Sequence, residues 1–353
     1  MSPHTSTNVR RIALVFSLGL FGCDVGRTSA ASAPNASVST RTGDASPANA
    51  TMAPNGYYTS GNTIYRYDGT PHQFHGVDRP SLEWSPIGEN LSLGDYQKMA
   101  GWGANVVRIA LNQAFWLRTA GYPQTVDQQV TWAEMAGLDV ILDLHWSDRG
   151  TTGTAAQQRM ADSNSKIFWR EVADAYESDG RVLFELYNEP HDVSWDVWLD
   201  GGASGDGFTV VGMQELYDTV RGEGAQNLVV IGGLENAYDL SGVPSFRVKG
   251  ENIAYATHPY DFPNKSASDW PSAWGFLAKT DPVIVTEFGV TNGSCDASYD
   301  SQVISYSDSV GASWTGWAWY VKDCSFPSLI TDWNGTPSAA GAVVRAALAA
   351  YGG

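Results

Sequence analysis

Short apolar runs rich in β-branched residues alternate with helical patterns along most of the chain. Eight runs are expected to be strands: residues 75–77, 105–111, 138–144, 182–187, 228–231, 253–256, 283–286 and 315–319. Segments with apolar residues three to four positions apart separate most of them, and the expected helices are 91–99, 126–135, 155–176, 208–220, 269–277, 301–310 and 339–351. Eight strand–helix units predict an α/β fold in which a parallel sheet closes into one (β/α)8, or TIM, barrel.

The first 56 residues differ in composition from the rest. Two arginines precede an apolar run, residues 12–22, that is too short to span a membrane and typical of a signal peptide. The run ends at Cys23, in a sequence similar to a bacterial lipoprotein cleavage box. We therefore expect a signal peptide over residues 1–23, with either a lipid on Cys23 or a simple secreted form. Residues 24–56, rich in Ser, Thr, Ala, Asn and Pro, predict a disordered linker before a domain at 57–353.

The net charge of the chain excludes some classes of binding partner. A formal net charge of −17 argues against nucleic acid and against an anionic membrane surface, and leaves a lipid anchor as the one expected membrane contact. The six His and three Cys show no metal-ligand spacing, so neither a metal nor a cofactor is expected. Export permits a disulfide between Cys295 and Cys324, with two unpaired buried thiols as the alternative. A monomer is the default expectation.

Polar and aromatic side chains replace apolar ones where the predicted strands end. Because the carboxyl ends of the strands meet at one rim of a barrel, these side chains are expected to surround one site. In chain order they are Arg108, His145, Asn188, Glu189, His258, Tyr260, Glu287 and Trp319. Two carboxylates over one cavity are typical of glycoside hydrolysis.

The two acids are expected to play different roles. Glu287 would attack the sugar carbon, and Glu189 would protonate the leaving oxygen, for which it needs a raised pKa. Arg108 is expected to pair with Glu287, and Tyr260 to donate a hydrogen bond to the same carboxylate. The remaining expectations are Asn188 at the sugar 2-hydroxyl, His145 and His258 as hydrogen-bonding walls, and Trp319 as the floor.

Several of these residues lie in recognisable motifs, namely Val107-Arg108, Leu142–Trp146, Leu186–Pro190, Thr257–Tyr260 and Thr286–Gly289. Together, and in this order, they resemble glycoside hydrolase family five, the cellulase-type retaining β-glycanases. The resemblance implies Glu189 as acid/base and Glu287 as nucleophile of a retaining double displacement that uses no metal or cofactor. It implies a β-linked polysaccharide or oligosaccharide substrate, with β-1,4-glucan expected. A β-mannanase, a xyloglucanase or an exo-acting β-glycosidase remain alternatives, because these enzymes share the barrel and the catalytic pair and differ only in the loops that contact the substrate.

Other residues near the motifs have two interpretations. Glu185 and Asp143 are expected to be buried structural carboxylates. Five tryptophans could line sugar subsites or pack between helices and barrel, and these are Trp84, Trp116, Trp146, Trp270 and Trp274.

Two other classes of protein fit the sequence less well. A carbohydrate-binding protein on an inactive barrel would lack one of the two carboxylates, and both are present. A barrel enzyme for phosphorylated metabolites would carry a Gly-rich phosphate loop after the seventh and eighth strands. Those positions, residues 291–293 and 320–322, hold one Gly and one Lys, which is a poor phosphate site.

Overall fold

The structure, a computed structural model, describes residues 55–147, 157–205 and 207–351. The expected signal peptide, the expected lipidation site Cys23 and all but the last two residues of the expected linker lie outside these ranges. Among the described residues, no helix is both long enough and apolar enough to cross a membrane.

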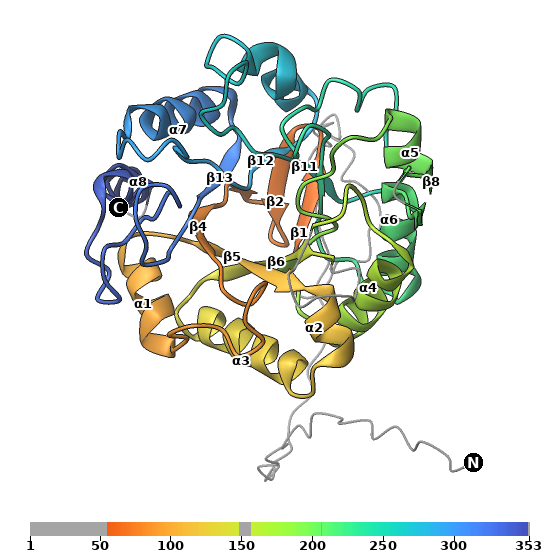
Figure 1. Cartoon of the computed structure of the whole chain (residues 1–353), viewed down its shortest axis with the longest axis horizontal. Coiled ribbons are helices and arrows are strands. Elements are labelled where there is room, and N and C mark those ends of the chain that lie inside the picture. The colour runs from red at the N-terminus through yellow and green to blue at the C-terminus, as the bar shows by residue number, and fades with distance from the viewer. Residues whose placement is uncertain (1–54, 148–156, 206, 352–353) are drawn as a thin grey trace, which may run out of the picture. The chain divides into compact units, whose positions relative to one another are not determined.

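Eight parallel strands close into a barrel, which Figure 1 shows along its axis. Their burial on both faces explains why the sequence reads as continuous apolar runs. The register closes where Trp314 of the last strand pairs with His75 of the first. The barrel strands are β4 (His75–Arg79), β5 (Val106–Asn112), β6 (Asp139–Trp146), β7 (Val182–Glu185), β10 (Val229–Gly232), β11 (Ile253–Thr257), β12 (Val283–Val285) and β13 (Ser313–Gly316).

Helices surround the barrel, so the predicted (β/α)8 fold is confirmed. They are α1 (Leu93–Gly101), α2 (Gln113–Arg118), α3 (Tyr122–Met135), α4 (Ser163–Tyr176), α5 (Trp195–Asp200), α6 (Met213–Gly222), α7 (Ser298–Val310) and α8 (Ala339–Tyr351). Side-chain caps fix four of the starts, those of α1, α2, α4 and α5. Ser92, for example, accepts from the backbone of Asp95, and Asp162 forms a capping box with Ser165.

The structure differs from the predicted helices at several places. Among the described residues the predicted helix 155–176 begins only at Ser163, and the short helices α2 and α5 were not predicted. The segment predicted as a helix over 269–277 forms a π-helical turn, Pro271–Gly275, and a 3-10 turn, Leu277–Lys279. The predicted helix 208–220 begins later, at Met213, because Thr209–Val210 (β9) pairs with Gly202–Ala203 (β8) in a short antiparallel ladder.

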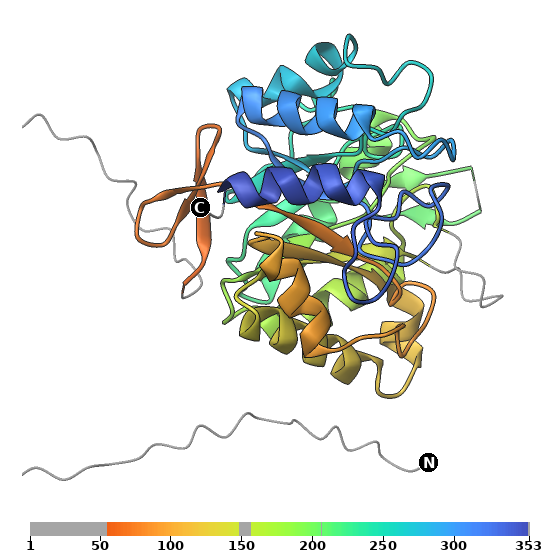
Figure 2. The same ribbon diagram turned by 90° about the vertical axis from the view of Figure 1, so that its left-hand side faces the viewer.

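A three-stranded antiparallel sheet that the sequence analysis did not predict precedes the barrel. It consists of β1 (Tyr57–Ser60), β2 (Thr63–Arg66) and β3 (Pro71–His72), and Figure 2 shows it in orange at one end of the barrel. Tyr57 and Ile64 pack in one apolar cluster with residues at the amino-terminal ends of the barrel strands, such as Val106. This sheet therefore covers the amino-terminal end and leaves the opposite rim for the site.

Candidate active site

Arg108, on β5, is the centre of a buried ionic network at the carboxyl rim. Its side chain is fully buried and is held by one amide and four carboxylates. The distances from guanidinium nitrogen to acceptor oxygen are 2.6 Å to Glu287, 2.6 Å to Glu185, 2.7 Å to Asn188, 3.0 Å to Asp143 and 3.1 Å to Asp78. Five fixed donors on one rigid plane thus set the positions of groups from four different strands, β4, β6, β7 and β12.

Glu287 follows β12 and is 3% exposed. Its Oε1 accepts from Arg108 at 2.6 Å, and its Oε2 accepts from the Tyr260 hydroxyl at 2.6 Å. These are the two contacts that the sequence analysis expected for it. A cation and a phenol that both donate to one carboxylate fix its orientation.

Glu189 follows β7 and is bonded to His258, which lies after β11. The ring Nδ1 of His258 is 3.1 Å from Glu189 Oε1, and its Nε2 is 2.9 Å from the Thr286 hydroxyl. That hydroxyl donates its own proton to Glu185, so it accepts from Nε2–H of His258. A single further proton therefore lies between Nδ1 of His258 and Oε1 of Glu189.

The electrostatics place this proton on the histidine. Burial alone would lower the pKa of His258, but the negative charge of Glu287, the nearby carboxylate of Glu185 and the hydrogen bond to Glu189 raise it to about 10. Burial alone would raise the pKa of Glu189, but the hydrogen bond and charge of His258 lower it. The expectation that the pKa of Glu189 is raised is therefore wrong for the substrate-free site, because the sequence did not reveal its partner.

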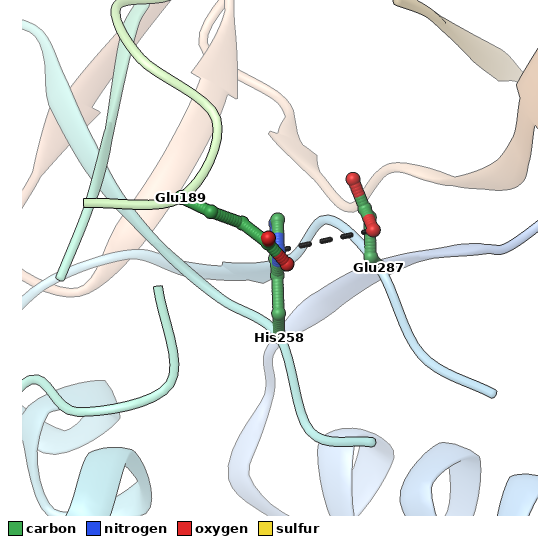
Figure 3. Close-up of side chains that lie close together, drawn as sticks. All are labelled: Glu189, His258 and Glu287. Carbon is green, nitrogen blue, oxygen red and sulfur yellow. Dashed lines mark hydrogen bonds and ion pairs between the residues drawn. The ribbon is translucent and has the colours of Figure 1, made fainter. Parts of the chain in front are cut away.

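The carboxylates of Glu189 and Glu287 face one another across His258, as Figure 3 shows. One ligand atom from each of the three residues lies within 4.8 Å of the other two. Paired carboxyl groups about 5 Å apart suit direct attack on a sugar carbon, whereas a gap of about 6.5 to 9.5 Å leaves room for a water between them. The geometry fits direct attack.

His145 lies beside Glu287, with its Nδ1 3.8 Å from Oε1 of that carboxylate, and Trp317 stacks on the His145 ring. Nδ1 of His145 is 2.7 Å from Asp143, and the ring stacks on Trp317 with centroids 5.3 Å apart. Burial lowers the pKa of His145 to about 4, so the ring is neutral at neutral pH. A neutral His145 donates Nδ1–H to Asp143 and keeps its Nε2 as an acceptor.

Trp319 does not form the floor of the site, and this prediction is wrong. Its side chain is fully buried, its indole Nε1 donates to Asp95 at 2.8 Å, and its ring packs edge-on against Trp102. The reason is that β13 spans Ser313–Gly316, so it begins two and ends three residues earlier than predicted, and Trp317 takes the position at the rim. Trp317 packs in a cluster with Tyr260 and is a site residue that the sequence analysis missed.

An aromatic group extends from Trp317 along the rim. It consists of Trp84, Trp146, Tyr320 and Phe326, with neighbouring ring centroids 5.3 to 6.3 Å apart. Glu89 accepts from the Trp84 indole at 2.8 Å and from the Tyr320 hydroxyl at 2.5 Å, which orients both rings. Of the five tryptophans with two interpretations, Trp84 and Trp146 are part-exposed here, whereas Trp116, Trp270 and Trp274 are buried in the core.

Buried acids surround this site beyond the predicted pair. Glu185 and Asp143 are fully buried, as expected. Burial alone would raise the pKa of Glu185, but Arg108 lowers it to about 2. Burial raises the pKa of Asp78, Asp143 and Glu83 well above the usual range. Glu83 was not predicted, because nothing in its sequence context distinguishes it from a loop residue.

Cys295 and Cys324 form the predicted disulfide, which joins the loop after β12 to the loop after β13. The first of these loops follows Glu287, and the second follows Trp317 and carries Phe326. The crosslink therefore connects two segments that frame the site.

Comparison with known proteins assigns the family. A family model described as cellulase (glycosyl hydrolase family 5) matches residues 66–323, which include each predicted rim residue. The chain belongs to glycosyl hydrolase family 5. Members of this family hydrolyse O-glycosyl bonds, so the protein is a glycoside hydrolase.

Relatives of the family 5 chain are distant in sequence. It is 24% identical to cellulase CelDZ1 of Thermoanaerobacterium sp, over 72% of this chain and 68% of that protein. It is also 24% identical to endoglucanase E-5 of Thermobifida fusca, over 72% of this chain and 53% of that protein, so it spans about half of the latter. The fold matches that of β-glucanase SdGluc5_26A from Saccharophagus degradans, in a complex with cellotetraose, with a TM-score of 0.70 at 23% identity over 88% and 99% of the two chains.

Proposed function

We propose that the protein is a retaining endo-β-1,4-glucanase in which Glu287 is the nucleophile and Glu189 the acid/base. The observation that carries this proposal is the approach of their carboxylate oxygens to within 4.8 Å of one another at the carboxyl rim of the barrel. The relatives named as a cellulase and an endoglucanase, and the cellotetraose bound by a β-glucanase of the same fold, support glucan as the substrate.

In the first step, an oxygen of Glu287 forms a bond to the anomeric carbon while the bond from that carbon to the leaving oxygen breaks. The proton held between His258 and Glu189 passes through Glu189 to the leaving oxygen. Formation of the ester removes the negative charge of Glu287, which is one of the causes that raise the pKa of His258. Attack by Glu287 thus lowers the pKa of His258, so the proton becomes available when the leaving oxygen must be protonated.

In the second step, Glu189 is a carboxylate and takes a proton from the attacking water. The water oxygen replaces Glu287 on the anomeric carbon, and the released charge of Glu287 again stabilises the proton on His258. Two displacements at one carbon retain its configuration.

The other rim residues bind substrate or orient the pair. Arg108 donates to the side-chain carbonyl oxygen of Asn188, and this fixes the orientation of the amide and therefore the direction of its NH2 group. We propose that this NH2 group donates to the sugar 2-hydroxyl, a contact that strengthens in the transition state. Trp317, stacked on His145, replaces Trp319 as the proposed floor under the sugar ring.

The proposed substrate is tested by identifying the sugars that the protein releases from different polysaccharides. Purified protein is incubated with cellulose, mixed-linkage glucan, mannan and xyloglucan, and the released sugars are separated. Glucan-derived oligosaccharides of several lengths at early times support an endoglucanase. Release from mannan or xyloglucan alone, or of a single short product, would replace this substrate assignment without changing the roles of the two acids.

We also propose that the protein is exported and carries a lipid on Cys23, on the basis of its amino-terminal sequence. The disulfide between Cys295 and Cys324 supports an oxidising compartment. Growth of an expressing bacterium with a labelled fatty acid tests the lipid. Label in the wild type and its loss in Cys23→Ala support the anchor, and secretion of unlabelled wild-type protein would favour the simple secreted form.

A further inference from the structure

A small cavity lies behind the disulfide-linked loops, away from the carboxylate pair. Its volume is about 20 Å³, and its lining includes Asp300, Ser328, Ser338 and the two cysteines. A space of this size holds about one water molecule or one small ion. The cavity lies between the first turn of α7, the start of α8 and the loops after β12 and β13.

Asp300 is an unusual residue to find there. It is 1% exposed, and neither of its carboxylate oxygens has a hydrogen-bond partner among the described residues. It lies in the first turn of α7, and Ala297 at the N-cap gives that helix no side-chain cap. Burial, followed by the charges of Asp261 and Asp296, raises the pKa of Asp300 to about 7. A buried carboxylate without a partner is costly, so this position demands a neutralising group.

Ser328 supplies a third buried oxygen without a hydrogen-bond partner. Its side chain lines the same cavity as Asp300, and its hydroxyl has no partner within the part of the chain that the structure describes. A proton on Asp300 would neutralise the charge but would leave the cavity empty. All three oxygens belong to residues that line the cavity, so they are the candidate ligands of a cation held there. Hydroxyl and carboxylate oxygens are the ligands that Na⁺ and Ca²⁺ prefer.

We propose that this cavity binds one hard cation, Na⁺ or Ca²⁺, through the carboxylate of Asp300 and the hydroxyl of Ser328. The site is separate from the proposed chemistry and does not depend on it.

The cation would stabilise the loops that carry residues of the active-site rim. Pro327, which lines the cavity, accepts from the backbone N–H of Ala318 at 3.0 Å, next to Trp317. A side-chain carbon added at Gly289 would meet the Pro327 ring at 2.6 Å, so Pro327 also packs closely on the segment that follows Glu287. An ion on Ser328 thus stabilises loops that hold both the floor and the nucleophile.

Thermal unfolding of the intact protein tests the proposal. Melting is followed at pH 8 after chelation, with choline chloride at constant ionic strength replaced stepwise by NaCl or, in a second series, by CaCl₂. We expect a saturable rise in Tm of about 3 °C or more in one series, which identifies the ion, because a ligand that binds only the folded state stabilises it. Asp300→Asn should lose the rise, and Ser328→Ala should shift it to higher cation concentration.

A matched control is Asp323→Asn, which removes an exposed acid next to Cys324 and should keep the full response. An unchanged Tm of the wild type in both series would overturn the proposal, as would an equal rise in Asp300→Asn. If both series are flat while Tm rises as the pH falls through 7 in the wild type alone, Asp300 holds a proton and the cation site is refuted. Should Asp300→Asn fail to fold, the response of Ser328→Ala relative to wild type decides.

Discussion

Glu189 and Glu287 extend from the ends of two strands that are not neighbours in the barrel, yet each brings a carboxylate oxygen to within 4.8 Å of the other. Barrel closure produces this approach, because strand ends from around the ring point side chains toward one axis. His258, from the strand between them in sequence, contacts Glu189 at 3.1 Å and lies 3.9 Å from Glu287. His258 and Glu189 therefore share a proton close to the charge of Glu287.

Glu287→Gln should abolish turnover while leaving the fold intact. The amide keeps the size of the side chain but cannot form the ester, so kcat on glucan should fall by at least about 10³-fold. Initial rates and melting temperature are measured together. Glu251→Gln, at an exposed position outside the site, is the control and should keep wild-type activity. Full activity in Glu287→Gln would remove the nucleophile assignment.

Glu189→Ala should separate the two steps. On an aryl cellobioside whose leaving group needs no proton, the first step should survive, so that a rapid burst of phenol is followed by slow turnover. On polysaccharide the same variant should lose about 10³-fold or more in kcat, because the leaving oxygen then needs its proton. Added azide, which attacks without a base, should restore turnover of the aryl substrate. A proportional loss on both substrates with no rescue would contradict an acid/base role.

The stability of the protein should fall with rising pH on account of His258. Its pKa is raised from 6.5 to about 10 on folding. The contribution is therefore fully present below pH 6.5 and is lost as the pH rises through 10, with a total on the order of a few kcal/mol. Urea unfolding from pH 6 to pH 10 measures it. His258→Gln should flatten this dependence, whereas His191→Gln, at a part-exposed ring, should leave it unchanged. Equal slopes in wild type and His258→Gln would refute the raised pKa.

Trp317 and Trp319 should respond in opposite ways to truncation. Trp319→Ala removes a fully buried ring and its bond to Asp95, and should destabilise the protein by about 3 to 5 kcal/mol. Trp317→Ala should change Tm less and should lower kcat/KM about 10- to 100-fold, because a stacking surface for the sugar is lost. Chemical denaturation and kinetics on both variants decide. A catalytic defect in a fully stable Trp319→Ala would restore the original assignment of the floor.

The sequence was sufficient for most of the barrel but not for its last strand. Around β13 the chain carries Trp314, Trp317 and Trp319 among small residues, with few β-branched residues to mark the end of the strand. A strand has a side-chain period of two, so a slip of two residues keeps each side chain on the same face and leaves the pattern unchanged. The slip nevertheless exchanges the rim position of Trp319 for that of Trp317.

Other features depended on contacts between distant segments. The short strands of the amino-terminal sheet resemble turn sequence, and their pairing becomes evident only against the end of the barrel. The motifs identified Glu189, but the direction of its pKa shift depends on His258, which reaches it from another strand. The four carboxylates that contact Arg108 likewise come from different strands, so the sequence did not predict that they share one arginine.

The most direct test of the paired-carboxylate mechanism is the anomeric configuration of the first product. Proton NMR during hydrolysis of a cello-oligosaccharide detects the new reducing end before mutarotation. The account predicts that the β-anomer appears first and the α-anomer follows slowly. Initial appearance of the α-anomer would mean that a water attacks directly, and would contradict the role of Glu287 as a nucleophile.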